Sequence, residues 1–423
     1  MTEPGWFRGA GLGIFVHWDH ASQQGLEISW SLAGVSSVPG SSQAQREVTP
    51  GQYHSSAATF DPRRWNPRAL ARLVRQAGAQ YVVFTTRHHN GYSMFHTRHS
   101  TFSIEHSPYG KDVTAELVDA LRAEGLRIGL YYSLSDWRHP DYPPFLESDK
   151  PYPHAGYRRS SPKAWGRYLD YVRGQLTELL TNYGRIDLLW FDGQWERTPE
   201  EWHAAELRAL ITSLQPHVLV NDRLPGQGDF VTPEGALPTI APAGPWEMCL
   251  TMGSSWGYRP DDTEYKSIGR ILTYLVEVAS RGGNLLLNVS PAGDGRLPEP
   301  QIARLREIGV WMQRHGESVR SVMPAPAYVE FDGPLAMRGS RLYLYLIMRP
   351  VDGATLRGIP VRRVRAVSLL GHNAQLGYQS NLGQHRAEEL GPEALGELFI
   401  HVPTLPASPL DVIAVDFDGP IQP

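Results

Sequence analysis

The sequence contains a single cysteine, Cys249, among its 423 residues. One thiol cannot form an internal disulfide, and it cannot build a zinc site that depends on several cysteines. Long apolar runs are also missing, because the longest stretches, such as residues 342–348, fall well short of the roughly 18 residues of a membrane span. No basic segment followed by an apolar one opens the chain, so no signal peptide is visible and we expect a cytoplasmic protein.

The sequence also lacks a strong excess of either charge. Its 40 Lys and Arg residues oppose 44 Asp and Glu residues, which gives a formal net charge of −4. No run of like charge stands out, so neither nucleic acid nor an acidic membrane surface is an expected partner. Aromatic residues are plentiful, with 12 Trp and 19 Tyr, which favours stacking against a neutral ligand. The oligomeric state stays open, a homo-oligomer included.

Short apolar segments alternate with amphipathic ones from the start of the chain to about residue 315. This alternation is typical of a parallel sheet with helices outside it. We expect strands at residues 13–18, 81–86, 127–133, 186–192, 217–221 and 284–289. A proline after a capping residue, or a capping box, indicates helix starts at Asn66-Pro67, Ser161-Pro162 and Thr198-Pro199-Glu200-Glu201.

Polar side chains follow all six predicted strands at the end where each strand stops. In strand order, they are His17 and Trp18; Arg87, His88 and His89; Ser133 and Asp136; Asp192; Asn221, Asp222 and Arg223; and Asn288. The C-terminal strand ends of a closed barrel meet at one mouth, where active sites form. No strand is followed by a Gly-x-Gly-x-x-Gly turn, so an open dinucleotide-binding sheet has no support. We predict a (β/α)8-like barrel over residues 1–325, with six strands identified.

The pattern changes near residues 323–326, after the last predicted helix. Alternating or β-branched segments follow at 341–346, 398–402 and 411–417, with turn residues between them. We therefore predict a small C-terminal antiparallel β-sandwich over residues 326–423.

One apolar stretch, residues 186–193, runs into a single carboxylate, Asp192, which is followed by Gly193. Such a run predicts a strand buried on both faces. An ionised carboxylate at its end needs hydrogen bonds or a nearby positive charge, which Arg223 could supply. The alternative interpretation is an ordinary Asp-Gly turn.

A retaining glycosidase needs a second carboxyl group, held roughly 5–5.5 Å from the first. Glu234 is one candidate, because it follows a predicted strand and a Gly- and Pro-rich segment that would form a loop at the mouth. Glu247 is the other candidate. Each could instead be a glutamate at the start of a helix.

The adjacent pair His88 and His89 directly follows a predicted strand, and His17 and His20 stand after another. As metal ligands they would indicate a metallohydrolase. Neighbouring residues at a strand end diverge, however, and the sequence has no His-x-His or His-Glu-x-x-His spacing. Histidines that donate hydrogen bonds to sugar hydroxyls are the more economical interpretation. The rings of Trp30, Trp190 and Trp256 could face a sugar or belong to the core.

Five motifs, in register over residues 10–320, resemble those of glycoside hydrolase family 29, the retaining α-L-fucosidases. They lie at residues 13–18, 87–95, 110–133, 189–193 and 284–295. The resemblance implies a barrel with a C-terminal β-sandwich, a fucosylated oligosaccharide or glycoconjugate as substrate, and no metal or other cofactor.

The resemblance also implies roles for individual residues. Asp192 matches the nucleophile and Glu234 the acid/base, with Glu247 in reserve. The positions that match fucose contacts are His17, His88, His89, Tyr132, Trp190 and Arg223. The sequence departs from the family pattern at Asp19, where Gly is common, and at Asn90, where Asp is usual. Glu27 and Trp30 stand in for the family's Glu-Trp-Tyr segment.

We therefore expect a retaining α-L-fucosidase. Two alternatives remain at this point. One is a fucose-binding protein of the same fold without catalysis, and the other is a metal-dependent hydrolase that uses His17, His88 and His89.

Overall fold

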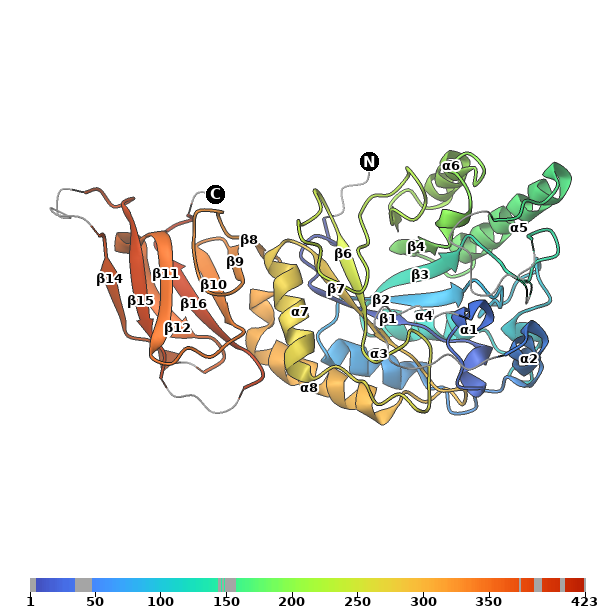
Figure 1. Cartoon of the computed structure of the whole chain (residues 1–423), viewed down its shortest axis with the longest axis horizontal. Helices are drawn as coiled ribbons and strands as arrows, with labels where there is room; N and C mark the ends of the chain where they lie inside the picture. Colours follow the sequence, from blue (N-terminus) through green and yellow to red (C-terminus); the bar gives the residue numbers. More distant parts are fainter. Residues whose placement is uncertain are drawn as a thin grey trace.

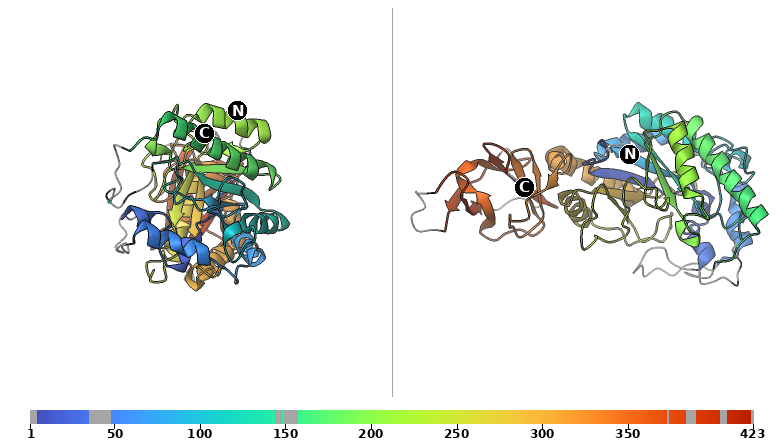
Figure 2. Two further views of the ribbon diagram at one scale, coloured as in Figure 1. Left: turned by 90° about the vertical axis from the view of Figure 1, so that its right-hand side faces the viewer. Right: turned by 90° about the horizontal axis from the view of Figure 1, so that it is seen from above.

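The computed structural model describes residues 5–34, 48–143, 146, 148, 157–372, 374–383, 390–403 and 408–421. An α/β part makes up most of the chain, and antiparallel sheets form its C-terminal end (Figure 1). Helices α7 (Ile268–Ser280) and α8 (Glu299–His315) lie between the two (Figures 1 and 2). None of the described helices combines the length and the apolarity needed to cross a bilayer.

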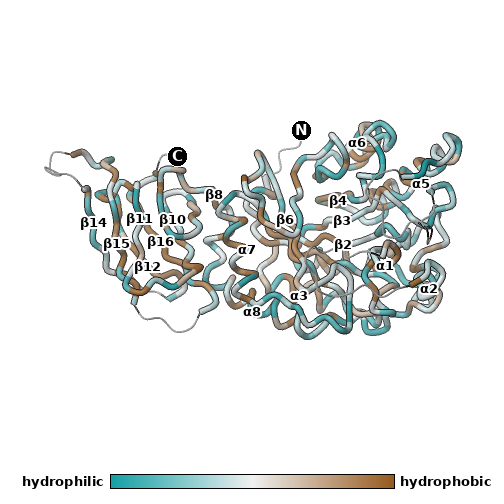
Figure 3. Tube along the Cα trace, viewed as in Figure 1, coloured by the Kyte–Doolittle hydropathy of each residue, from teal (hydrophilic) through white to brown (hydrophobic). Residues whose placement is uncertain are grey.

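The α/β part is built on a curled, seven-stranded parallel sheet with the order β5-β4-β3-β2-β1-β7-β6. Its strands are β1 (Leu12–Val16), β2 (Tyr81–Arg87), β3 (Arg127–Ser133), β4 (Leu188–Asp192), β5 (Leu219–Val220), β6 (Glu247–Thr251) and β7 (Asn284–Val289). A parallel strand covered on both faces needs apolar residues at successive positions, and the apolar runs of the sequence provide them. Hydrophilic segments lie mainly in the outer helices and loops (Figure 3).

All six predicted strands are present, with small differences at their ends. The sequence does not predict β6, because this strand starts with the charged Glu247 and has only three apolar residues in a row. A (β/α)8-like barrel requires eight parallel strands, and the described residues contain seven in this sheet. The closed barrel is therefore not confirmed.

A loop connects the two edge strands of the sheet through backbone hydrogen bonds. On one side, Asp229 N donates to Val220 O of β5 at 2.7 Å. On the other side, Glu247 N of β6 donates to Val231 O at 2.9 Å, and Cys249 N donates to Pro233 O at 3.1 Å. Glu234 therefore lies on a segment that is fixed at both edges of the sheet.

The helices of the α/β part follow the predicted start signals in two cases of three. They are α1 (Trp30–Ala33), α2 (Pro50–Ser55), α3 (Pro67–Gln76), α4 (Val113–Ala123), α5 (Pro162–Thr181) and α6 (Ala204–Leu214), with α7 and α8. Asn66 and Ser161 cap α3 and α5 as predicted. The capping box of Thr198 and Glu201 forms both of its bonds, but it closes a turn, and α6 begins only at Ala204.

The C-terminal end contains two antiparallel sheets, with the orders β13-β12-β16-β10-β9-β8 and β11-β15-β14. Their strands are β8 (Met323–Pro324), β9 (Leu335–Arg338), β10 (Arg341–Leu346), β11 (Gly353–Pro360), β12 (Val364–Leu369), β13 (Ala374–Gln375), β14 (Tyr378–Asn381), β15 (Leu395–His401) and β16 (Asp411–Phe417). All three predicted strands are present as β10, β15 and β16. Side chains of both sheets share one apolar core. The sandwich arrangement and the domain boundary at residue 325 stay predictions.

Candidate active site

The inner face of the parallel sheet carries a small apolar cluster that includes Phe15 of β1, Tyr131 of β3 and Trp190 of β4. Successive side chains of a strand point to opposite faces, so every second residue faces this cluster. One step beyond Phe15 and Trp190 on the same face lie His17 and Asp192. The candidate site therefore sits on top of the inner cluster, at the C-terminal ends of the strands.

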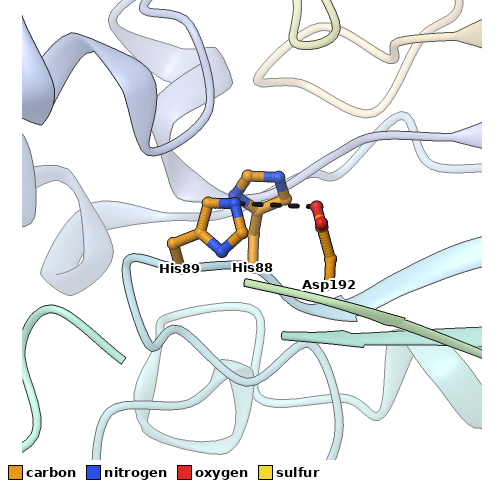
Figure 4. A group of neighbouring side chains, drawn as sticks. All are labelled: His88, His89 and Asp192. Atoms are coloured by element: carbon orange, nitrogen blue, oxygen red, sulfur yellow. Dashed lines mark ion pairs between the residues drawn. The ribbon is translucent and has the colours of Figure 1, made fainter. Parts of the chain in front are cut away.

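Asp192 is buried, with 8% of its surface exposed, and both of its oxygens have partners. Arg223 Nη1 lies 2.8 Å from Oδ1, and the Tyr131 hydroxyl donates to Oδ2 at 2.8 Å. His89 Nε2 is 3.6 Å from the same Oδ2 (Figure 4). Burial raises the pKa of Asp192, but the charge of Arg223, the neighbouring His89 ring and the two hydrogen bonds outweigh burial, so the pKa lies below its ordinary value. The carboxylate is therefore ionised at neutral pH.

Arg223 connects the two predicted catalytic carboxyl groups. While Nη1 binds Asp192, Nη2 lies 2.6 Å from Glu234 Oε2. The guanidinium also covers the ring of Trp190, with its central carbon 4.4 Å from the ring centroid. The Glu234 side chain is 34% exposed and that of Asp192 only 11%. One carboxyl group is thus enclosed, and the other is open to solvent.

The three predicted histidines are each held through Nδ1, which leaves Nε2 for a ligand. The partners are Asn288 Oδ1 for His17 at 2.7 Å, Ser29 Oγ for His88 at 2.6 Å and Ser133 Oγ for His89 at 2.7 Å. Burial lowers the pKa of His17 to about 3 and that of His89 to about 4, and it holds the pKa of His88 well below its ordinary value. All three rings are therefore neutral at pH 7.

His88, His89 and Asp192 bring three potential metal ligands within 4.8 Å of one another (Figure 4). This set differs from the alternative set of three histidines, since it does not include His17. Both oxygens of Asp192 already have partners, and one of these is the cationic Arg223. A cation beside Asp192 would be repelled by that guanidinium. The donor set suits hydroxyl groups better than a metal.

Aromatic side chains surround the histidines. Trp30 packs edge-on against His89, with ring centroids 5.5 Å apart, and stacks with Trp195 at 6.2 Å. On the other side, the ring of Trp256 lies 5.0 Å from that of His17. Half-buried Trp30 thus lies beside the histidines, and its contact with a sugar ring stays a prediction.

Trp190 lies below the site rather than in it. Its ring is only 2% exposed, stacks on Tyr131 at 5.6 Å and supports Arg223 on its face. Both groups that hold Asp192 therefore rest on the indole of Trp190.

Tyr132 is not part of the site, which corrects its assignment as a fucose contact. Its hydroxyl donates to Gln175 Oε1 at 3.0 Å, and Arg87 covers its ring at 4.2 Å. Both contacts lie on the outer face of the sheet, towards the helices. Tyr131, one residue earlier, faces inwards because a shift of one position along a strand reverses the face.

Glu247 is also distant from the mouth, because it is the first residue of β6 and lies below Trp190. Its carboxyl group is fully buried, accepts a hydrogen bond from Trp190 Nε1 at 2.9 Å and a second from the Tyr81 hydroxyl. Burial raises its pKa to about 7. This environment suits a structural carboxyl group and leaves no room for a leaving group.

Tyr131 and Ser29 are not predicted as site residues from the sequence, and Asn288 is predicted only as the end of a strand. Strand alternation could have identified Tyr131, since Asp192 and Trp190 on the neighbouring strand face the same way. Nothing local identifies Ser29, which comes from a loop before α1.

Comparisons with known proteins identify the family of the chain. Residues 1–317 match the family model described as Alpha-L-fucosidase. The tissue alpha-L-fucosidases of Bos taurus and Homo sapiens are 31% and 29% identical to the chain, and each alignment covers 96% of it and 86% of the relative. The structure of alpha-L-fucosidase isoenzyme 1 from Paenibacillus thiaminolyticus has a TM-score of 0.83 and 32% identity, covering 98% of this chain and 99% of that one. The chain therefore belongs to the alpha-L-fucosidases, glycoside hydrolase family 29, and is an enzyme of that family.

Proposed function

We propose that this enzyme releases terminal α-L-fucosyl residues from glycans by a retaining double displacement. Asp192 is the nucleophile and Glu234 the acid/base. The observation that carries the proposal is the shared contact of Arg223, which holds one buried and one exposed carboxyl group together at the end of the inner cluster. A retaining glycosidase needs such a pair, roughly 5–5.5 Å apart.

In the first step, an oxygen of Asp192 attacks the anomeric carbon of the fucosyl residue. The bond from that carbon to the leaving oxygen breaks, and Glu234 transfers its proton to this oxygen. In the second step, Glu234 takes a proton from water, whose oxygen attacks the same carbon and displaces Asp192. The depressed pKa of Asp192 supports the nucleophile role, and the exposure of Glu234 lets it exchange protons with solvent.

The substrate is a fucosylated oligosaccharide or glycoconjugate. The Nε2 atoms of His17 and His88 are available to its hydroxyl groups, that of His89 is buried beside Asp192, and Trp30 offers a ring face. These residues account for binding and both chemical steps without a cofactor.

Azide rescue of an activated α-L-fucoside assay tests the choice of acid/base. Glu234→Ala should accumulate the fucosyl-enzyme, and azide should accelerate its breakdown and yield a fucosyl azide of retained configuration. Glu247→Ala is the matched control and should show no rescue. Rescue of Glu247→Ala alone would transfer the role to that residue.

Elemental analysis separates this mechanism from metal-dependent hydrolysis at His88, His89 and Asp192. We expect activity to survive a chelator in protein without stoichiometric metal. Loss of activity on chelation, with recovery on adding a metal ion, would favour the alternative. A binding protein without catalysis would bind fucosides but release no fucose.

For the fold, we propose that the loop from Asp229 to Gly235 occupies the eighth place of a barrel. Its backbone bonds to β5 and β6 support this arrangement. We propose in addition that the two C-terminal sheets form a β-sandwich, which their common apolar core supports.

A further inference from the structure

Ser29 has a backbone conformation that residues with side chains rarely adopt. Its φ is 59° and its ψ is −44°, and Trp30 N donates to Ile28 O at 2.6 Å across it. These values describe a γ-turn whose central residue has positive φ, a rare and strained turn. Glycine would adopt it at little cost. A fully buried serine in this strained conformation indicates that its hydroxyl group has a role.

The Ser29 hydroxyl connects two residues of the segment after β2. Its oxygen accepts a hydrogen bond from Asn90 N at 2.9 Å and lies 2.6 Å from His88 Nδ1. A hydroxyl has one hydrogen to donate, and among the described residues His88 Nδ1 is the only acceptor within its reach. The hydroxyl therefore donates to Nδ1. Since His88 is neutral, its own proton is on Nε2.

The other two histidines have the opposite arrangement. Ser133 Oγ donates to Ser135 O at 2.7 Å, which leaves it to accept from His89 Nδ1, and Ser135 Oγ lies 3.2 Å from the same nitrogen. Asn288 Nδ2 donates to Trp256 O at 2.8 Å, which turns its Oδ1 towards His17 and makes His17 Nδ1 a donor. In these neutral rings Nε2 therefore carries a lone pair. His89 Nε2 is buried, makes no hydrogen bond within the described ranges and lies beyond hydrogen-bond distance of Asp192 Oδ2, at 3.6 Å.

We propose that Ser29 is a positioning residue that keeps His88 in its Nε2–H form, so that His88 alone of the three histidines donates a hydrogen bond to a fucosyl hydroxyl. His17 accepts a hydrogen bond from a hydroxyl group, while the buried Nε2 of His89 faces Asp192. This inference rests on the proposed function for the identity of the ligand. It explains why a strained serine is kept, because glycine has no hydroxyl group to donate.

Two departures from the family pattern support the arrangement. Asp19 Oδ2 accepts a hydrogen bond from Asn90 Nδ2 at 2.5 Å. The same Nδ2 and the backbone N of Ser29 both donate to the Tyr53 hydroxyl, at 3.0 and 2.6 Å. Asp19 and Asn90 thus fix the segment whose backbone N–H binds the Ser29 oxygen.

The first test reads the tautomer directly. Protein labelled with ¹⁵N-histidine is measured by NMR without ligand at neutral pH, and loss of a signal in His88→Gln assigns His88. We expect an unprotonated Nδ1 and a protonated Nε2 for His88, and the reverse for His17 and His89. A protonated Nδ1 on His88 in the wild type would overturn the inference, even if no Ser29 variant folds.

Two substitutions then separate the hydroxyl group from the backbone strain. Ser29→Gly removes both, while Ser29→Ala removes the hydroxyl and keeps the strain. In both, the Nδ1 and Nε2 signals of His88 should move towards each other as a second tautomer is populated. The kcat/KM for an α-L-fucoside should fall roughly 2- to 12-fold, the effect of one neutral hydrogen bond.

Ser31→Ala, at a buried serine of helix α1 directly after Ser29, is the matched control and should leave the His88 signals unchanged. Unchanged His88 signals and unchanged kcat/KM in both Ser29 variants would contradict the inference. A wild-type enzyme inactive on every α-L-fucoside would instead refute the proposed function, and the spectrum without ligand would still decide the tautomer.

Discussion

The pair Tyr131 and Tyr132 offers a sharp test, because adjacent tyrosines of one strand face opposite sides of the sheet. Tyr131→Phe removes the hydroxyl that donates to Asp192 at 2.8 Å. Tyr132→Phe removes a hydroxyl of the same size that donates to Gln175 at 3.0 Å. Only the first substitution touches the proposed nucleophile.

The expected size follows from the charge of the acceptor. A hydrogen bond to a charged group is worth roughly 1.5–3 kcal/mol, so Tyr131→Phe should lower kcat/KM roughly 10- to 150-fold. The lost bond is one of the contacts that lower the pKa of Asp192, so this pKa should rise. Because the ionised form is the nucleophile, activity should then be lost at a higher pH as the solution is acidified.

The assay is a pH profile of kcat/KM with a chromogenic α-L-fucoside. Tyr132→Phe should keep the wild-type profile and lose roughly 1 kcal/mol of unfolding free energy, the effect of a neutral hydrogen bond. A Tyr131→Phe enzyme with normal activity, beside a Tyr132→Phe enzyme with a shifted profile, would refute this account of the site.

Two further substitutions test Arg223, beside Asp192, and Glu247, below Trp190. Arg223→Lys keeps the charge but cannot bind both carboxyl groups in the same way, so kcat/KM should fall about 100-fold or more in steady-state assays. The pKa of Glu247 is raised from 4.5 to about 7, so the native state retains this proton and wild-type stability falls as pH rises through that range. Relative to the wild type, Glu247→Gln should therefore gain unfolding free energy between pH 5 and pH 8, by up to roughly 3 kcal/mol in denaturant titrations. If the difference in unfolding free energy between Glu247→Gln and the wild type did not change with pH, Glu247 would not titrate in this pH range.

The sequence predicts the parallel strands well where apolar runs are long, and it fails where they are not. β6 is missed because its run of apolar residues is short and begins after Glu247. The missed strand matters for function, since Glu247 looks like a loop residue without it. Its true place, below Trp190 at the start of a buried strand, removes it from the mouth.

The sequence predicts which residues form the candidate site better than it predicts the contacts between them. Asp192, Arg223 and Glu234 are brought together as expected, although Arg223 and Glu234 come from a loop whose path no local pattern predicts. Tyr132 is assigned from the family resemblance alone, whereas strand alternation, with Trp190 and Asp192 facing the same way, favours Tyr131.

Contacts between distant segments explain the features of the site that the sequence does not predict. Asp19 and Asn90 appear in the sequence as two separate departures from the family pattern, and in the structure they bind each other. The positive φ of Ser29 is locally unfavourable, so only tertiary contacts maintain it. Neither feature has a sequence signal within a few residues of its position.

In the proposed mechanism, Asp192 forms a covalent fucosyl-enzyme. The most direct test of this step is peptide mass spectrometry after incubation with a 2-fluoro-fucosyl fluoride, which slows release of the intermediate. We predict one fucosyl adduct on the peptide that contains Asp192 and none in Asp192→Ala. An adduct on another residue, or continued turnover of the reagent without any adduct, would contradict the account.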